Sequence, residues 1–259
     1  MKISPFFVAL TVAASLFLGT TANAADTISP AQKTQIETIV HDYLLKNPDV
    51  IIQAVQAMQQ KAADAMRSHG AEAGLKNANA LAASALDPVE GNPQGKVSVI
   101  EFFDYQCPHC VDMMPVFKAL VKDNPDVRIV YKDFPIRGPL SSYAAKAALA
   151  ANKQGKYIEF HDALMKAAPT GLTEAKIDAI AKTLGLDLKK FKSDMNGDAV
   201  TAQIKGNYKL AQDIGIMGTP AIFVFKTTLP KDADATAINF IPGQVDEKYL
   251  LDAVTQASK

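Results

Sequence analysis

The chain contains only two cysteines among its 259 residues, and just two positions separate them, as Cys107 and Cys110. A disulfide that closes so short a loop removes little conformational entropy from the unfolded chain, so its contribution to stability is small. The pair follows an apolar, β-branched run typical of a buried strand, residues 97–103, and precedes a helical pattern at 113–122. A Cys-x-x-Cys between a strand and a helix therefore predicts redox chemistry rather than a structural bridge.

The position at the start of a helix predicts different roles for the two sulfurs. Unpaired backbone N–H groups and the partial positive charge of a helix N-terminus stabilise a thiolate, so we expect Cys107 to be the nucleophile. Cys110, one turn inside the helix, is expected to be more shielded and to resolve a mixed disulfide formed on Cys107. No metal site is expected, because zinc usually takes four ligands and the chain has no second cysteine pair.

The two residues between the cysteines are a proline and a histidine. Pro108 suits the first turn of a helix for geometric reasons alone. His109 would place a polarisable or cationic ring beside the thiolate, so we expect it to lower the pKa of Cys107 further. The alternative is that His109 is an exposed residue at the helix start with no role.

The order of patterns along the chain predicts an α/β fold. The strand at 97–103, the helix that follows the cysteines and a second strand at 127–131 imply a parallel pair with a right-handed crossover. Helical patterns then occupy about residues 140–215, followed by strands at 221–225 and 236–241 and a last helix that starts at Asp246. A turn-rich stretch at 87–95 marks a boundary. We therefore expect a catalytic domain over residues 88–259, preceded by a separate helical extension.

The extension, residues 25–87, carries an apolar stripe at helical spacing. Asn47 is a suitable N-cap and Pro48 a suitable first residue for the second of two helices. The stripe comprises Ile36, Ile39, Val40, Tyr43 and Leu44, then Ile51, Ile52, Val55 and Met58. Because the two helices contain no core-forming partner of their own, the stripe packs either against the rest of the chain or against another copy. We expect a helical oligomerisation module, with a plain intramolecular helix as the alternative.

Residues 1–24 have the pattern of an export signal. Lys2 gives a basic start, residues 6–19 form an apolar stretch, and Ala22-Asn23-Ala24 supplies a small-residue cleavage pattern. The apolar stretch falls short of the roughly 20 residues of a spanning helix, which argues against a membrane anchor. The mature chain is therefore expected to start near Ala25 and to work outside the cytoplasm. The 27 acidic and 27 basic residues balance, so charge favours no nucleic-acid partner.

Two segments resemble the DsbA family of periplasmic disulfide oxidoreductases. They are Val99-Ile100-Glu101-Phe102-Phe103-Asp104-Tyr105-Gln106-Cys107-Pro108-His109-Cys110, which resembles the active-site segment, and Gly218-Thr219-Pro220, which resembles the cis-proline loop. The resemblance covers about residues 88–259 and implies a thioredoxin fold with an inserted helical domain. It also implies that the bond between Thr219 and Pro220 is cis and faces the cysteines, with the Thr219 backbone free to bind an extended substrate segment.

The resemblance gives a role to an acid in the first strand. Glu101 lies six residues before Cys107 in an otherwise apolar run, where a buried carboxyl group is costly unless it is partnered or exchanges a proton. The matching acid of the family lies beneath the disulfide and assists proton movement, and we expect Lys132, at the end of the second strand, to be its partner. The alternative is an ion pair in solvent at a strand edge.

The extension departs from the monomeric members of this family. Monomeric DsbA-type oxidases generally lack a segment such as residues 25–87, whereas isomerases such as DsbC carry an N-terminal dimerisation module. Thr219, before the proline, also resembles the isomerase version. The chain is therefore similar to the DsbA2, Com1 and ScsC groups, and we expect a homo-oligomer, with a dimer favoured.

Together these features predict a protein disulfide oxidoreductase and isomerase that needs no bound cofactor. Its expected partners are unfolded or misoxidised exported proteins and a DsbB-like or DsbD-like membrane protein. The expected location is the periplasm, with association with the outer membrane as a further option. The alternative function is a self-associating periplasmic chaperone or surface protein with a secondary redox role, whose client-holding activity would survive the substitution Cys107→Ser.

Overall fold

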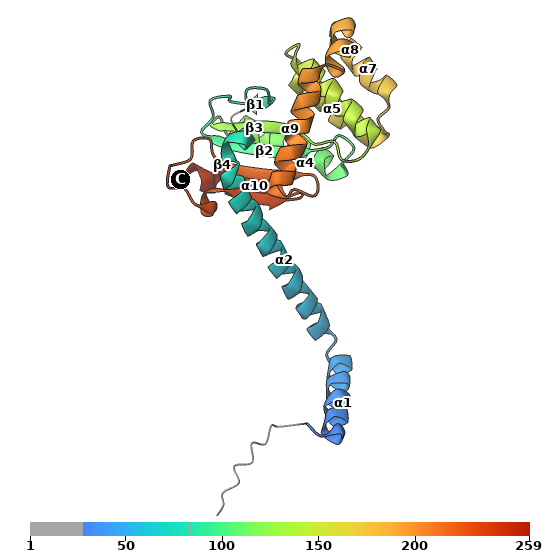
Figure 1. Cartoon of the computed structure of the whole chain (residues 1–259), viewed down its shortest axis with the longest axis vertical. Coiled ribbons are helices and arrows are strands. Elements are labelled where there is room, and N and C mark those ends of the chain that lie inside the picture. Colours follow the sequence, from blue (N-terminus) through green and yellow to red (C-terminus); the bar gives the residue numbers. More distant parts are fainter. Residues whose placement is uncertain (1–27, 83) are drawn as a thin grey trace, which may run out of the picture. The chain divides into compact units, whose positions relative to one another are not determined.

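A computed structural model describes residues 28–82 and 84–259 (Figure 1). The chain divides into two compact units, Met1–Ala57 and Met58–Lys259. The expected export signal, residues 1–24, lies outside the described residues. Within the described part of the chain, every helix is too short or too polar to cross a membrane.

Two helices form most of the N-terminal extension. Helix α1, Pro30–Lys46, begins with a capping box in which the side chains and backbone N–H groups of Ser29 and Gln32 bond to each other reciprocally. Asn47, predicted to start the second helix, instead closes the first, because its side-chain amide donates to a carbonyl of the last turn at 2.8 Å. Helix α2 then runs over Asp49–Lys76.

The second unit is built around a five-stranded mixed sheet. Its strands, in the spatial order β1-β3-β2-β4-β5, are β1 Val89–Gly91, β3 Val127–Asp133, β2 Val97–Phe103, β4 Ala221–Lys226 and β5 Asn239–Pro242. Strands β2 and β3 are parallel, as predicted, and all other neighbours are antiparallel. The predicted α/β class is therefore confirmed.

Helices cover the sheet and form the insert between β3 and β4. They are α3 Ala78–Ala82, α4 Pro108–Asp123, α5 Pro139–Asn152, α6 Tyr157–Ala167, α7 Glu174–Thr183, α8 Leu188–Met195, α9 Asp198–Ile214 and α10 Glu247–Ser258. Figure 1 shows α5, α7 and α8 of the insert gathered together. Alanines on the buried side of α5 allow its neighbours to approach closely, since Ala144, Ala147 and Ala148 are fully buried.

Two strands differ from the sequence prediction. Strand β1 lies inside the stretch predicted as a turn-rich boundary, and three residues are too few to give an alternating pattern. The strand predicted at 236–241 begins only at Asn239, because residues 235–237 form a 3₁₀ turn. The side chain of Asp234 stabilises that turn by accepting from the N–H of Thr236 at 2.8 Å.

The two faces of the sheet bury different elements, because alternate strand residues point to opposite sides. Val97, Val99 and Phe103 of β2 lie in a core with α4, α10 and the insert. Ile100 and Phe102 of the same strand lie in a second core with the end of α2, α3 and α9. The cysteines belong to the first core.

The end of α2 lies directly against the aromatic side chains of β4 and β5. A Cβ atom at Gly70 would overlap the ring of Phe240, and one at Gly74 would come within 2.9 Å of the ring of Phe223. Only glycines allow this close approach. Residues 70–82 therefore contribute to the core of the second unit, and the two compact units divide well before the domain boundary expected at residues 87 and 88.

Candidate active site

The cysteines occupy the first turn of α4. Cys107 is the N-cap residue and Pro108 begins the helix, so the backbone N–H of Cys110 donates to the carbonyl of Cys107 at 3.1 Å. Both cysteine side chains are buried, and both are free thiols in this structure. Cys107 lines a cavity of about 200 Å³, whose other walls are Gln106, Pro108, Val111, Asp112, Ala168 and Pro169. The first sulfur therefore lies where a small group can approach it.

The structure brings the loop before β4 to the first cysteine. The Thr219-Pro220 peptide bond is cis. The thiol of Cys107 donates to the carbonyl oxygen of Thr219 at 3.2 Å. The hydroxyl of Thr219 is buried and has no hydrogen-bond partner among the described residues.

The pKa of Cys107 is lowered from its ordinary value to about 5. The largest cause is a hydrogen bond from the Cys110 thiol, and a bond from the Thr219 hydroxyl and the positive charge of Arg137 add to it, while burial opposes them. The Thr219 hydroxyl lacks a partner while Cys107 is a thiol, so ionisation of the sulfur supplies the missing acceptor. At neutral pH this sulfur is mostly thiolate, the form that attacks disulfides.

The second cysteine behaves in the opposite way. Burial raises the pKa of Cys110 far above its ordinary value, and the hydrogen bond to Cys107 and the negative charge of Glu101 raise it further. Cys110 therefore stays a thiol at neutral pH. The two sulfurs of one short motif are held in different protonation states, which matches the nucleophile and resolving roles expected from their positions.

Glu101 is 1% exposed and, because strand residues alternate, points to the same face of the sheet as Val99 and Phe103. Burial raises its pKa well above the ordinary value, and the charge of Cys107 raises it further. Its Oε1 atom has no hydrogen-bond partner among the described residues. Burial therefore favours the protonated form of this carboxyl group, and its unbonded oxygen remains available to give or take a proton.

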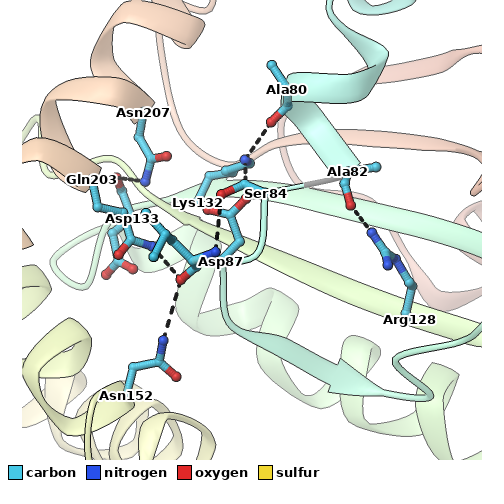
Figure 2. Close-up of polar contacts among 11 residues, drawn as sticks. Ala80, Ala82, Ser84, Asp87, Arg128, Lys132, Asp133, Asn152, Gln203 and Asn207 are labelled. Atoms are coloured by element: carbon cyan, nitrogen blue, oxygen red, sulfur yellow. Dashed lines mark hydrogen bonds and ion pairs between the residues drawn. The ribbon is translucent and has the colours of Figure 1, made fainter. Parts of the chain in front are cut away.

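Lys132 is not the partner of Glu101, and that prediction is wrong. The parallel register places Lys132 beside Phe102, and consecutive residues of a strand point to opposite faces, so Lys132 lies on the far side of the sheet from Glu101. There it forms a buried ion pair with Asp87 and donates to the carbonyl of Ala80 at 2.8 Å (Figure 2). The solvent-exposed strand-edge pair is ruled out as well, because both carboxylate and ammonium are buried.

His109 is exposed at the start of α4, and its Nδ1 atom lies 2.7 Å from Oε1 of Gln244 in the loop after β5. The hydrogen bonds that lower the pKa of Cys107 come from Cys110 and Thr219. The proposed effect of His109 on the thiolate stays a prediction.

Sequence reasoning missed a polar cluster beside the cysteines. Asp104, Gln106, Arg137 and Ser141 link the turn before Cys107 to the start of α5 through side-chain and backbone hydrogen bonds. A carboxylate placed directly after a buried strand was the available signal for Asp104. Within the described residues, histidine, cysteine, aspartate and glutamate side chains form no group of three or more that could hold a metal ion.

Two parts of the chain match known protein families. Residues 98–254 match the DSBA-like thioredoxin domain, and residues 32–65 match the N-terminal domain of the copper resistance protein ScsC. The second match lies over the apolar stripe of α1 and the first part of α2.

The chain is also similar to individual proteins. The chain is 34% identical over 206 residues to the thiol:disulfide interchange protein DsbA of Burkholderia cepacia, a similarity that covers 71% of this chain and 95% of that protein. It is also 34% identical over 146 residues to the Na(+)/H(+) antiporter NhaA 3 of Salinispora tropica, covering 53% of this chain but only 21% of the antiporter. The solved structure of Salmonella enterica Typhimurium BcfH is 30% identical with a TM-score of 0.70, covering 88% of this chain and 97% of that one.

Proposed function

Because the chain belongs to the DSBA-like thioredoxin family of thiol-disulfide oxidoreductases, we propose that it forms and isomerises disulfides in exported proteins through Cys107 and Cys110. The observation that supports this proposal best is the contrast between the two sulfurs. The pKa of Cys107 is lowered to about 5, whereas that of Cys110 is raised. Disulfide exchange needs this contrast, because one sulfur must attack or be attacked while the other waits.

In the oxidising direction the Cys107–Cys110 disulfide accepts two electrons from a client dithiol. A client thiolate attacks the sulfur of Cys107, a client–Cys107 disulfide forms, and Cys110 leaves as a thiolate that takes a proton. A second client thiolate then attacks the client sulfur of the mixed disulfide, and Cys107 leaves as a thiolate. In isomerisation, reduced Cys107 attacks a wrong client disulfide first, and a client thiol later displaces it, so no net electrons are exchanged.

Glu101 is proposed to carry the proton of the second cysteine. The departing Cys110 thiolate is unstable in its buried position, because its pKa is raised, and it needs a proton at once. A buried carboxyl group with an unbonded oxygen, whose protonated form is favoured by burial, is suited to give that proton and to take it back when the disulfide forms again.

The cis-proline loop is proposed to hold the client. The Thr219 carbonyl accepts from the Cys107 thiol in this structure, so the loop lies within hydrogen-bond distance of the sulfur that would bond to the client. Met217, two residues earlier, is 94% exposed, and the cavity beside Cys107 has apolar walls from Val111 and Pro169. An extended segment with an apolar side chain next to its cysteine would fit these surfaces.

We further propose that the extension joins copies of the chain, with a dimer favoured. Helix α1 has no buried residue. The exposed large apolar side chains of α1 and the first part of α2 are Ile36, Ile39, Val40, Tyr43, Leu45, Ile51, Ile52, Val55 and Met58. Burying part of such a stripe stabilises an oligomer by about 25 cal/mol per Å² of apolar area. Association would place two or more Cys107 sites around a shared client-binding space.

The proposed location is the periplasm, where a membrane redox protein of the DsbB or DsbD kind would set the resting state of the cysteines. Thiol trapping of the protein taken directly from cells tests this part. A mostly oxidised pair indicates a net oxidase, and a mostly reduced pair indicates a net isomerase.

Insulin reduction and the refolding of scrambled ribonuclease test the proposed function. Both activities should be present in the wild type and lost in Cys107→Ser, whereas Cys110→Ser should accumulate mixed disulfides with clients. Suppression of client aggregation is the matched measurement for the chaperone alternative, which the exposed stripe favours. If the wild type lacks both exchange activities but suppresses aggregation equally well with and without Cys107, the exchange proposal is wrong.

A further inference from the structure

A buried carboxylate connects the cysteine turn to a distant loop. Asp104 follows β2 directly and is 1% exposed. Its Oδ1 atom accepts from the N–H of Gln106 and from the hydroxyl of Ser141, each at 2.7 Å, and its Oδ2 atom accepts from the N–H of Arg137 at 2.8 Å. Three donors satisfy this carboxylate, as a buried charge requires.

Gln106 strengthens the same connection from the residue next to Cys107. Its side-chain amide donates to the Ser141 hydroxyl at 2.7 Å and to the carbonyl of Arg137 at 3.3 Å. The N–H and the C=O of Arg137 are therefore both bonded to the turn that carries the nucleophile.

The side chain of Arg137 takes no part in these hydrogen bonds, which involve only its backbone N–H and C=O. Arg137 is exposed, and it forms no ion pair with any described residue. The next residue, Gly138, adopts a positive φ of 108°, which only glycine tolerates readily, and Pro139 then starts α5. The loop is thus short and sharply turned, so its position is defined while the guanidinium stays free.

We propose that Asp104 is a positioning residue which holds Arg137 beside Cys107, so that the guanidinium charge stabilises the attacking sulfur. The inference rests on the proposed exchange chemistry of Cys107 and adds two residues to it. The positive charge of Arg137 is one of the groups that lower the pKa of this cysteine. Arg137 can act there only while the loop is tied to the cysteine turn.

Other groups also face the sulfur and must stay constant in any test. They are Cys110 of α4, Glu101 of β2 and the uncharged hydroxyl of Thr219, together with Asp112, which lines the same cavity as Cys107. None of them is bonded to Asp104 through its side chain. Substitutions at Asp104 and Arg137 therefore leave these groups in place.

The first variant is Arg137→Gln, which removes the charge at an exposed position and should not affect folding. We expect it to raise the pKa of Cys107 by about 0.5 to 1, the effect of one partly screened charge at short range. The rise should shrink in 1 M salt, because an exposed charge is screened. Arg67→Gln is the matched control, since Arg67 lies on α2 and pairs with Asp64. Thiolate absorbance is the measurement.

The second variant, Asp104→Asn, distinguishes a positioning role of Asp104 from a direct effect of its charge, because the two predict opposite changes in the pKa of Cys107. Removing a nearby negative charge would by itself lower the pKa of Cys107. Losing the loop attachment removes the influence of Arg137 and raises that pKa instead. We expect Asp104→Asn to raise the pKa of Cys107 above that of the wild type. In the Arg137→Gln background, which has no guanidinium to position, we expect Asp104→Asn to cause no further rise.

Ser141→Ala keeps every charge and removes only the bond from Ser141 to Asp104 and the bond from Gln106 to Ser141, so it replaces Asp104→Asn if that variant does not fold. It should raise the pKa of Cys107 by a smaller amount. A lowered pKa in Asp104→Asn, or an unchanged pKa in Arg137→Gln, overturns the inference. Thiol titration needs no client, so the pKa of Cys107 can be measured whether or not the protein exchanges disulfides. A wild type without exchange activity would refute the proposed function but would leave the pKa changes in these variants as a separate test of the positioning role.

Discussion

The C-terminal part of the extension, residues 70–87, is called the extension root here. The buried ion pair of Lys132 and Asp87 gives a quantitative test of how this root is attached to the sheet. Figure 2 shows the pair between β3 and the segment that follows α3, with Ala80 as a second acceptor for the ammonium group. The two side chains are 2% and 3% exposed. We consider Lys132→Met, Asp87→Leu and the double variant.

The direction of both pKa shifts indicates how these variants should rank. Burial raises the pKa of Asp87 and lowers that of Lys132, and in each case burial outweighs the attraction of the partner. The buried ion pair as a whole therefore lowers the free energy of unfolding, although the charge of each residue reduces the cost of burying the other. Each single variant should lose about 3–5 kcal/mol of unfolding free energy, whereas the double variant should lie close to the wild type or above it.

The pH dependence of the two single variants should have opposite signs. In Lys132→Met the remaining Asp87 has a folded pKa above its unfolded value, so stability is present below the unfolded pKa and is lost as pH rises through the folded pKa. In Asp87→Leu the remaining Lys132 has a folded pKa below its unfolded value. Its stability is present above the unfolded pKa and is lost as pH falls through the folded pKa.

Urea unfolding followed by far-UV circular dichroism is the assay, because the chain contains no tryptophan for fluorescence. Measurements at pH 5, 7 and 9 cover both slopes. Lys96→Met is the matched control, since Lys96 pairs with Asp126 at 3.5 Å with both side chains mostly exposed, and it should change stability by less than about 1 kcal/mol. If Lys132→Met costs no more than Lys96→Met, or if the double variant loses the sum of the single losses, the reasoning is refuted.

Two further predictions concern the redox pair and the domain boundary. Glu101→Gln keeps the shape of the side chain but removes its proton, so oxidation of a model dithiol in stopped flow should slow by about 100-fold at pH 7; an unchanged rate would exclude the proton role. A chain that starts at residue 88 loses the buried Leu81 and leaves Lys132 without Asp87, so it should fail to fold, whereas one that starts at Met58 should fold and be monomeric in light scattering. Equal circular dichroism spectra from both chains would contradict this boundary.

Local patterns in the sequence were enough to predict the redox centre. The strand before Cys107 and the helix after it are each continuous in the chain, so their periodicity could be recognised without any tertiary information. The helix start indicated which cysteine would be the nucleophile. The size of the contrast also depends on burial of Cys110 and on the hydroxyl of Thr219, which come from the tertiary packing.

Features that depend on distant segments were not predictable in the same way. The expectation that Lys132 pairs with Glu101 rests on the resemblance to the DsbA family and on the place of Lys132 at the end of the second strand. Which face each side chain takes depends on the strand register, and one residue of offset reverses it. The partner that Lys132 does have, Asp87, comes from a turn-rich segment 45 positions away. Likewise, the bond between Asp104 and Arg137 joins loops 33 positions apart.

The root of the extension escaped prediction for a different reason. The apolar stripe ends before the buried part of α2, where the side chains that face the sheet are Gly70, Ala71, Ala73 and Gly74. Small residues contribute little to an apolar periodicity, yet they allow the closest packing of a helix on aromatic rings. A pattern of large side chains therefore identified the exposed part of the helix and missed the buried part.

The redox cysteines and the attachment of the extension lie on opposite faces of the sheet. Glu101 reaches the cysteines from one face of β2, while Phe102, the next residue, packs on the other face with the core that contains α3 and the end of α2. Among the described residues, no side-chain bond of Lys132 crosses to the core that holds the cysteines, so a change at Lys132 reaches Cys107 through the backbone of β2 and β3. Packed strands shift little when one buried pair is replaced by apolar side chains of similar size. The double variant should therefore keep the pKa of Cys107 at about 5 while its stability changes. A titration of that variant therefore tests directly whether the extension root and the redox centre are independent: a shifted pKa would mean that the sheet transmits strain between them.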